Sequence, residues 1–326
     1  MYLYNSFYGT KSLAKVYGEE HIDEIVSMII RNSFSEGNDE IVQFLKNINF
    51  VTELSIEEEK RLCYLEKRKV INSPDLILTI LPTESCNFRC LYCYENHNPI
   101  FMCKRTQDSL VNFVEEKIKT CRNLYVNWFG GEPLLALDVI EHLSEEFIKI
   151  TTKYKKAYLA SMTTNGYLLT PEMVKLLLKY RVIDYQVTLD GAAPVHDSLR
   201  TLSGGGNTFN VIVKNLLDVT KQVKSSLINI VIRTNYTKPI YENLPMFFDE
   251  LSKLNNKNIN FLIRLATNWG GDVVQNISKD ILDETYYKRI INFFTNAPSK
   301  LNFKSHISSY DMHTNACSAA RCNSYV

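Results

Sequence analysis

The chain lacks both a long apolar segment and an excess of charge of either sign. Its 326 residues include 37 Lys and Arg against 36 Asp and Glu, so no overall field attracts nucleic acid or an anionic membrane. No run approaches the ~18 apolar residues of a membrane span, and the N-terminus lacks the basic segment of a signal peptide. We therefore expect a cytoplasmic protein that binds neither nucleic acid nor a membrane.

Cysteine is too scarce for a disulfide framework in a chain of this length. Only eight cysteines are present, and three of them lie close together at Cys86, Cys90 and Cys93. This clustering is typical of a bound metal or cofactor in a reducing compartment. The other five are scattered, at Cys63, Cys103, Cys121, Cys317 and Cys322. We interpret the first three of these as packed thiols.

Residues 1–74 are expected to form a separate small α+β extension. Alternation over Tyr2–Phe7 and the segment Leu13–Val16 predict two short strands. Helical patterns follow within the extension, at 22–30, 41–45 and 56–69. Asn72-Ser73-Pro74 then breaks the pattern and marks a boundary. Such a unit resembles winged-helix elements that bind leader peptides, and the alternative is a packing extension that covers the opening of a barrel.

From residue 75 to about 305, strand-like runs alternate with helical patterns. Strands are predicted at 76–81, 124–129, 158–164, 185–189, 228–233 and 259–265. A helix follows each strand, at 106–119, 139–153, 170–179, 208–220, 244–254 and 284–294. Asn207 or Thr208 is expected to cap the fourth helix. Six such units predict an α/β fold with a parallel sheet, a partial (β/α)6 barrel, because a closed barrel of this type has eight.

The unusual loops of this repeat all follow the carboxyl ends of strands. The cysteine cluster follows the first strand, and Gly130–Pro133, Thr164–Gly166 and Asp190–Gly191 follow the next three. Ligands of parallel α/β folds bind at that edge of the sheet. Any one of these loops could be an ordinary turn, but four at one edge predict a shared site.

Three thiolates are compatible with two kinds of metal centre. A structural zinc site needs four protein ligands, and His97 could complete a Cys3His set with the three cysteines. A [4Fe-4S] cluster is normally bound by four cysteines. With three, one iron keeps an open position, which the amino and carboxylate groups of S-adenosylmethionine (SAM) could fill.

The spacing Cys86-x3-Cys90-x2-Cys93, with Tyr92 before the last cysteine, resembles the signature of the radical SAM superfamily. The resemblance extends over roughly residues 76–300 and implies a [4Fe-4S] cluster on these cysteines with SAM beside it. Gly130-Gly131-Glu132-Pro133 resembles the family's glycine-rich motif, which binds the methionine amino group. The glycines would permit close backbone approach, and Glu132 would accept a hydrogen bond from the ammonium.

A more specific resemblance is carried by Val187–Gly191 and His196–Arg200. This pair of segments is similar to a stretch of the peptide- and protein-modifying members that have a C-terminal SPASM region. A serine hydroxyl and an arginine help to bind SAM in those members. Thr188 keeps the hydroxyl here, and Arg200 stands at the arginine position.

Four further polar residues follow strand ends in the same part of the chain. Asn165 and Asn235, after strands three and five, are candidates to reach the ribose or the adenine of SAM. His196 and Asp197 are part of the resemblance to the peptide-modifying members. The alternative for these two is that they cap and solvate a loop.

Residues 306–326 resemble the opening of a SPASM region. Cys317 and Cys322 are present, but the longer cysteine series of such a region does not follow. Two cysteines alone cannot complete an auxiliary cluster, so that cofactor is expected only if further ligands exist. We interpret the sequence as truncated here, and the alternative is that the two cysteines pair with ligands from elsewhere.

The resemblance implies an enzyme that modifies a peptide, most simply a ribosomally made one. A reductant such as flavodoxin or ferredoxin would reduce the cluster, SAM would be cleaved, and the 5′-deoxyadenosyl radical would remove hydrogen from a peptide or protein substrate. One alternative is a sulfatase-type maturase that forms formylglycine, which needs a general base near the substrate carbon. Another alternative is a metal-binding fragment without turnover. No catalytic acid or base is assigned from the sequence.

Overall fold

The chain divides into two compact units, Met1–Lys69 and Val70–Val326. The computed structural model describes residues 2–3, 14–15, 75–254, 257–266, 278–296 and 324–325. In the first unit, strand β1 (Tyr2–Leu3) pairs antiparallel with β2 (Ala14–Lys15), which confirms the two predicted strands. The three helices predicted in this unit lie outside the described residues, as do Cys63, Cys317 and Cys322.

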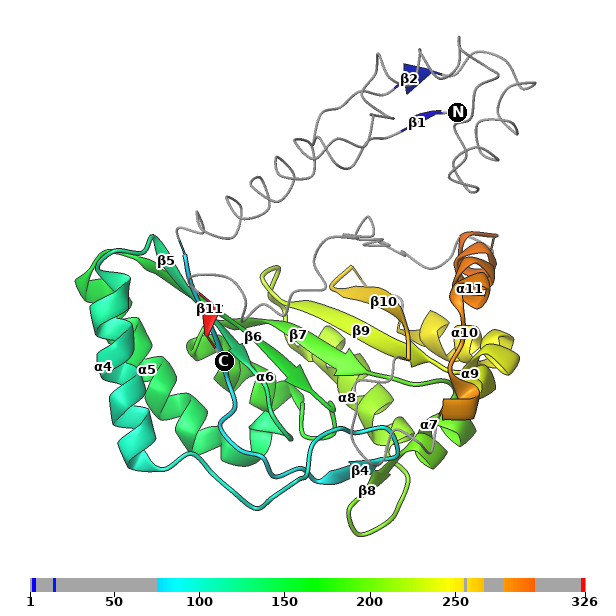
Figure 1. The fold of residues 1–326 in the computed structure, drawn as a ribbon, viewed down its shortest axis with the longest axis horizontal. Helices are drawn as coiled ribbons and strands as arrows, with labels where there is room; N and C mark the ends of the chain where they lie inside the picture. The colour runs from blue at the N-terminus through cyan, green and yellow to red at the C-terminus, as the bar shows by residue number, and fades with distance from the viewer. Residues whose placement is uncertain are drawn as a thin grey trace, which may run out of the picture. The chain divides into compact units, whose positions relative to one another are not determined.

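The second unit is built on one parallel sheet (Figure 1). Six of its strands come in chain order: β3 (Leu76–Ile80), β5 (Asn123–Trp128), β6 (Ala157–Thr164), β7 (Val182–Thr188), β9 (Asn229–Tyr236) and β10 (Ile259–Leu265). All of their pairings are parallel, which confirms the six predicted strands and the partial-barrel fold class. A further short strand, β11 (Ser324–Tyr325), pairs parallel with β3 and was not predicted.

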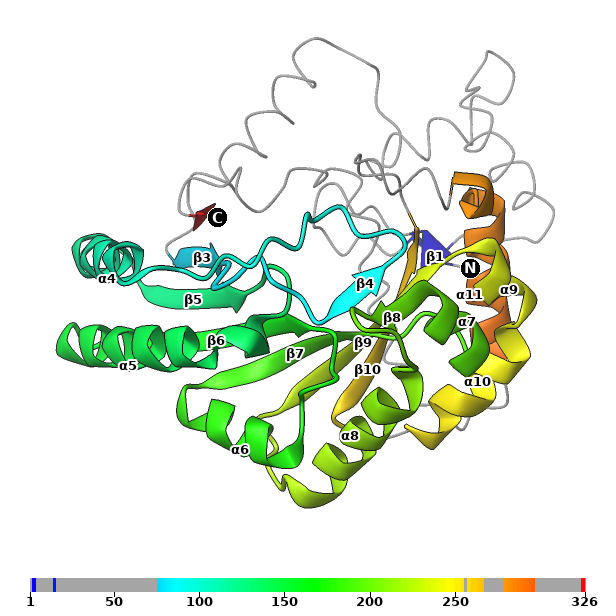
Figure 2. The same cartoon turned by 90° about the horizontal axis from the view of Figure 1, so that it is seen from below.

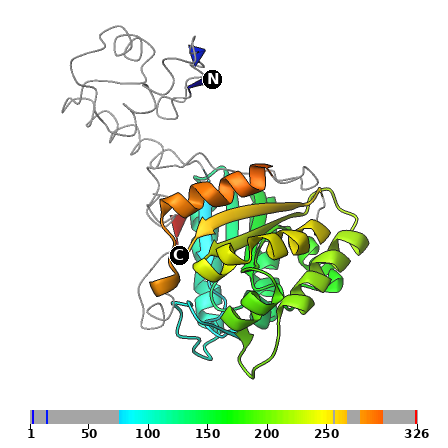
Figure 3. The same cartoon turned by 90° about the vertical axis from the view of Figure 1, so that its right-hand side faces the viewer.

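The predicted helices are present, with ends that differ by a few residues. They are α4 (Lys104–Ile118), α5 (Leu137–Lys153), α6 (Pro171–Lys179), α8 (Phe209–Gln222), α10 (Leu244–Lys253) and α11 (Glu284–Asn296). Figure 2 shows α4, α5, α6 and α8 along one side of the curved sheet. Figure 3 shows the edge formed by β10, α10 and α11. At this edge Phe248 packs against Phe293 and Phe294. Within the described residues, no helix combines the length and apolar character needed to cross a membrane.

The two faces of the sheet differ in polarity. On β9, for example, Ile230, Ile232 and Tyr236 are buried on the helix side, whereas Arg233 and Asn235 on the other face are only half-buried. A parallel sheet covered by helices on both faces has nearly continuous apolar strands, so this alternation indicates a single helix-covered face. The other face is the polar interior of the partial barrel.

Five short elements at the carboxyl ends of the strands were not predicted. They are the 3-10 helix η2 (Pro133–Ala136), the helices α7 (Ala193–Leu199) and α9 (Lys238–Glu242), and an antiparallel pair of strands, β4 (Phe88–Cys90) with β8 (Arg200–Leu202). The β4–β8 pair joins the cysteine loop to a segment more than a hundred residues later. It therefore fixes the position of that loop over the end of the sheet.

Candidate functional site

The three clustered cysteines lie on the loop that follows β3, and all three are half-buried. Cys90 lies in β4, opposite Arg200 in the β4–β8 register. The amide of Cys93 donates to the Cys90 carbonyl at 3.1 Å, and the amide of Leu91 donates to the Leu199 carbonyl at 2.9 Å. We call residues 81–103, which carry the three cysteines, the thiol loop. Backbone hydrogen bonds thus connect the thiol loop with the segment that carries Arg200.

The surroundings of these thiols favour the protonated form when no metal is bound. Burial raises the pKa of Cys86 to about 11, although the Phe88 amide, 3.4 Å from Sγ, acts in the opposite direction. Burial also raises the pKa values of Cys90 and Cys93, and Arg200 opposes the shift at both. Binding of a metal as thiolates would therefore release protons.

Three half-buried thiols on one loop are a donor set that suits an iron-sulfur cluster, whereas a structural zinc ion needs a fourth protein ligand. In the described ranges, no three His, Cys, Asp or Glu side chains converge closely enough to hold one metal ion. A Cys3His zinc site with His97 requires such convergence around one point. In a [4Fe-4S] cluster each iron takes its own cysteine, so the thiolates surround the cluster and need not meet at one point.

The two glycines after β5 allow the next loop to pack tightly against the thiol loop. Gly131 donates its amide to the Thr83 carbonyl at 3.2 Å, and Glu132 donates to the Ser85 carbonyl at 2.9 Å. A Cβ on Gly131 would overlap the Ser85 carbonyl oxygen, and a Cβ on Gly130, whose φ is +101°, would lie 2.5 Å from that of Thr83. The expected close approach is therefore present, and it is an approach to the thiol loop.

Glu132 is a buried connector between two of these loops. Its side chain has no exposed surface, and it accepts hydrogen bonds from the amide of Leu134 at 3.1 Å, the hydroxyl of Thr164 at 2.8 Å and the amide of Asn165 at 2.8 Å. Burial raises the pKa of this carboxyl, and the three donors oppose that shift. Glu132 therefore ties the start of η2, with its buried Pro133, to the end of β6, a role that the motif alone did not suggest.

Asn165 makes a further connection to the thiol loop. Its Nδ2 donates to Oδ1 of Asn87 at 2.7 Å, and its Oδ1 accepts from the amide of Tyr167 at 3.0 Å. The side chain is 7% exposed. Asn165 thus lies at the carboxyl edge with the thiols, as its position after the third strand predicted.

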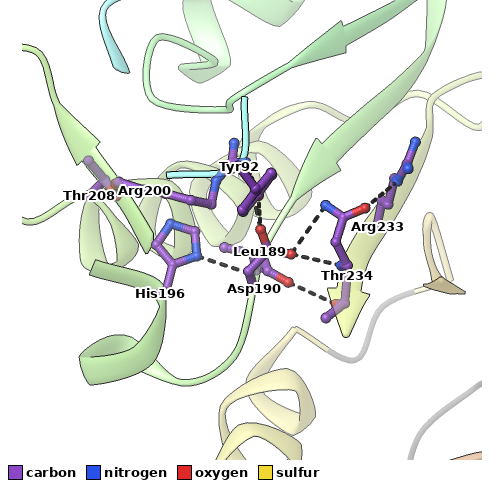
Figure 4. A network of polar contacts seen from close by, with 9 residues as sticks. Tyr92, Leu189, Asp190, His196, Arg200, Thr208, Arg233 and Thr234 are labelled. Carbon is purple, nitrogen blue, oxygen red and sulfur yellow. Dashed lines mark hydrogen bonds and ion pairs between the residues drawn. The ribbon is translucent and has the colours of Figure 1, made fainter. Parts of the chain in front are cut away.

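Asp190, at the end of β7, is the centre of a buried polar network (Figure 4). The hydroxyl of Tyr92 donates to Asp190 Oδ2, and Arg200 donates to the Tyr92 hydroxyl at 2.6 Å. Arg200 also lies 3.7 Å from Asp190 Oδ2, while the amide of Asn235 donates to Asp190 Oδ1 at 2.8 Å. Three of the predicted residues, Tyr92, Arg200 and Asn235, therefore meet at Asp190, a loop residue that was not among the predicted site residues.

One donor of Arg200 is left without a partner by the described part of the chain. Its Nε is buried and has no hydrogen-bond partner among the described residues. Arg200 as a whole is only 7% exposed. Leaving such a donor unsatisfied costs roughly 1–3 kcal/mol. A carboxylate is the preferred partner of a guanidinium, so this orphan N–H fits the carboxylate of SAM. Thr188 is the last residue of β7, two positions before Asp190, and it is buried.

His196 and Asp197 both have internal roles. Nδ1 of His196, which is fully buried, accepts from the Asp190 amide at 3.1 Å, so the idea that it solvates a loop is wrong. Asp197 does act as a cap: its Oδ1 accepts from the amides of Thr208 at 2.8 Å and Phe209 at 2.9 Å. Thr208 is the N-cap residue of α8, as predicted, but its side chain makes no cap hydrogen bond.

A cavity of about 430 Å³ lies along the polar face of the sheet. Its polar lining includes Asn127, Ser161, Asp184, Gln186, Asn229 and Asn260. Several of these are joined side by side: Ser161 donates to Asn127 at 2.5 Å, Asn229 to Asp184 at 2.9 Å, and Asn260 to Asn229 at 2.5 Å. The volume lies in the range of ordinary ligand pockets, and the lining supplies amide donors and acceptors.

The cysteines outside the cluster have different environments. Cys121 is buried, as predicted for a packed thiol. Cys103 is exposed at the start of α4, so the same prediction is wrong there.

The fold and the thiol loop define a class of protein: α/β partial-barrel enzymes that carry an iron-sulfur cluster at the carboxyl edge of the sheet. The model of the radical SAM superfamily matches residues 80–243, which is half of the chain. The chain belongs to the radical SAM superfamily, whose members use a [4Fe-4S] cluster and SAM.

Two similar curated proteins are a cyclopropyl synthase and a maturase by their names. The radical SAM cyclopropyl synthase TigE of Paramaledivibacter caminithermalis is 27% identical over 59% of this chain and 44% of its own length. The mycofactocin maturase MftC of Mycolicibacterium smegmatis is 28% identical over 43% of this chain and 33% of its own length. The chain thus spans less than half of either relative.

Solved structures support the fold. The enzyme anSMEcpe with bound AdoMet has a TM-score of 0.56 at 23% identity, over 68% of this chain and 60% of that one. Streptococcus suis SuiB bound to its precursor peptide SuiA has a TM-score of 0.53 at 18% identity, over 87% of this chain and 60% of that one. At identities this low, the likeness shows the fold alone.

Proposed function

We propose that this chain binds a [4Fe-4S] cluster through Cys86, Cys90 and Cys93, binds SAM at the neighbouring strand ends, and acts on a peptide. When bound, the cluster supplies the electron for reductive cleavage of SAM, and the SAM fragment removes a hydrogen atom from the substrate. The observation that carries the proposal is the convergence of Tyr92 and Arg200 on Asp190 beside the thiol loop.

Several of the predicted SAM residues have positions that support a task in binding SAM. The Gly130–Pro133 turn packs on the thiol loop and so presents its backbone next to the cluster position. The orphan Nε of Arg200 and the hydroxyl of Thr188 would bind the SAM carboxylate. Asn165 and Asn235, on either side of β7, are the candidates for the ribose and the adenine.

The polar cavity is the proposed place for the peptide. Extended peptide backbone needs alternating donors and acceptors, and the carboxamides of Asn127, Asn229 and Asn260 provide both. One curated relative described above is a maturase by name, and SuiB was solved with a precursor peptide. The reductant, such as flavodoxin or ferredoxin, and the leader-binding role of residues 1–74 belong to the same proposal.

The formylglycine alternative has less support. It needs a general base near the reacting carbon, and the carboxylate that the described cavity lining offers is Asp184. Asp184 lies four residues before Thr188 on β7, or about 13 Å along the strand. It also accepts a hydrogen bond from Asn229 at 2.9 Å. A base at that distance from the SAM site does not favour this reaction.

The test is anaerobic reconstitution with iron and sulfide, followed by SAM and dithionite. The wild type should bind iron and sulfide, absorb near 400 nm in the manner of iron-sulfur proteins, and release 5′-deoxyadenosine. Cys90→Ala should lose both the colour and the product, because two thiolates hold the cluster poorly. Cys103→Ala removes an exposed thiol outside the loop and is the matched control.

Two results would overturn the proposal. Binding of zinc without iron would show that the thiols form another kind of centre. A full iron and sulfide content with no 5′-deoxyadenosine would show that the cluster does not serve SAM cleavage.

A further inference from the structure

Two arginines extend from the polar face of the sheet next to the proposed SAM residues. Arg233 lies on β9 and Arg264 on β10, and the register places Arg264 beside Asn235 and Arg233 beside Leu262. Since side chains two residues apart on a strand share a face, Arg233 follows the cavity residue Val231, and Arg264 follows the cavity residue Leu262. Both cations therefore stand at the end of the cavity nearest the SAM residues.

Neither guanidinium has an anionic partner in the part of the chain that the structure describes. Nε of Arg233 donates to Oδ1 of Asn235 at 3.0 Å, which holds the guanidinium in place (Figure 4). Asp190 is nearby, but its carboxylate is already bound by Tyr92, Arg200 and Asn235. Asp184 lies level with Asn229 on the next strand, four residues before Arg233, which is about 13 Å away along the sheet.

Arg233 is half-buried, and its nearest carboxylate, Asp190, is shared with Arg200. Burial lowers the pKa of Arg233, and the charge of Arg264 acts in the same direction, whereas Asp190 opposes both. A half-buried cation without a partner is disfavoured unless a ligand supplies the opposite charge. The pair therefore fits an anion that arrives with the substrate.

The geometry points to a carboxylate of the peptide substrate, bound by Arg233 and Arg264 together beside the SAM site. Guanidinium groups present planar pairs of donors that match a carboxylate. The SAM carboxylate is assigned to Arg200, on the far side of Asp190 from Arg233, so the second anion belongs to the substrate. A peptide provides this group as a Glu or Asp side chain or as its C-terminus. This inference rests on the proposed function and adds a substrate requirement to it.

The test measures which peptides the protein retains. Reconstituted wild type with SAM is mixed anaerobically with pools of N-acetylated hexapeptides that contain one Glu or one Gln, with amidated or free C-termini. Retained peptides are counted by mass spectrometry after ultrafiltration. We expect enrichment on the order of tenfold for a carboxylate-bearing pool over the Gln-amide pool. The preferred pool distinguishes a side-chain carboxylate from a terminal one.

Variants connect the preference to the two arginines. Arg233→Gln and Arg264→Gln should each lose the enrichment, whereas Arg105→Gln, which removes an exposed charge on α4, should retain it. Arg264 is exposed, so its variant remains informative if Arg233→Gln fails to fold. The affinity for SAM is measured on the same samples.

Four outcomes would overturn the inference. The first is equal retention of all pools by the wild type, and the second is an unchanged preference in both arginine variants. The third is displacement of the peptides by a nucleoside triphosphate. The fourth is that the arginine variants lose affinity for SAM but still retain the carboxylate-bearing peptides. If the wild type still forms 5′-deoxyadenosine in those cases, the proposed function stands without this substrate requirement. If it forms none, the proposed function itself fails.

Discussion

The hydroxyl of Tyr92, on the thiol loop, donates a hydrogen bond to the carboxylate of Asp190, at the end of β7. The two residues are 98 positions apart, and Arg200 bonds to the same hydroxyl from β8. Asp190 has no exposed surface, so the carboxylate exchanges its hydration for these contacts and for the Asn235 amide. The contact therefore links the thiol loop to the proposed SAM-binding strand ends.

Tyr92→Phe should weaken both the fold and the binding of SAM. The substitution removes the hydroxyl that donates to the buried Asp190 carboxylate and accepts from Arg200. We expect the free energy of unfolding to fall by roughly 1–3 kcal/mol. Denaturant unfolding and calorimetric titration with SAM measure the two effects. Tyr180→Phe is the matched control, because that phenol also faces carboxylates, Glu141 and Glu145, but on the surface, where the loss should be about 0–1 kcal/mol. Equal losses in both variants would contradict the role given to Tyr92.

Gly131→Ala should prevent correct assembly of the thiol loop. An added Cβ would overlap the Ser85 carbonyl oxygen and lie 2.6 Å from that of Glu84, both of which are backbone atoms. We expect a loss of stability on the order of 1–3 kcal/mol or more, together with reduced iron content after reconstitution. Gly204→Ala is the control, because a Cβ there meets nothing within 4 Å. Normal iron content in Gly131→Ala would show that the two loops do not need this close approach.

The strands and helices of the second unit were predictable because each depends on local periodicity. Apolar residues at spacing two or at helical spacing identified the six repeated units, and parallel topology then placed four loops at one edge. The pairing of β4 with β8 was not predictable in this way. Cys90 and Arg200 meet there across more than a hundred residues, and neither local sequence contains a signal for the other.

The candidate site was predicted from motifs more fully than from physical reasoning about single residues. Arg200 and Tyr92 were selected by resemblance, but their common partner Asp190 was not, because a buried carboxylate in an Asp-Gly turn looks like any turn residue. Cys103 was expected to pack because cysteine is usually buried, yet it starts a helix at the surface. Arg233 appeared only as part of a strand, and its partner Arg264 became evident from the register.

Asp197→Ala should destabilise the start of α8. Asp197 accepts from the amides of Thr208 and Phe209, and loss of such a cap costs about 0.5–2 kcal/mol. Denaturant unfolding of the reconstituted protein measures this loss. Asp218→Ala, which breaks a surface ion pair with Lys214 within the same helix, is the control and should cost about 0.3–0.5 kcal/mol. A loss no larger than that of the control would show that the Asp197 contacts do not cap the helix.

His196→Gln should reduce the sensitivity of the fold to acid. Burial holds the pKa of His196 well below its ordinary value of 6.5, and Arg200 acts in the same direction. The unfolded chain therefore binds a proton near pH 6.5 that the folded chain does not. Stability from this residue is complete above that pH and decreases below it, by at most about 1.4 kcal/mol per pH unit. Gln can still accept from the Asp190 amide through Oε1, so the fold should be retained.

Chemical unfolding at pH 8 measures the pH-independent cost of the substitution, and a series from pH 7 to 5 should give a shallower decrease for the variant than for the wild type. Parallel decreases would show that His196 takes up its proton equally in the folded and unfolded states.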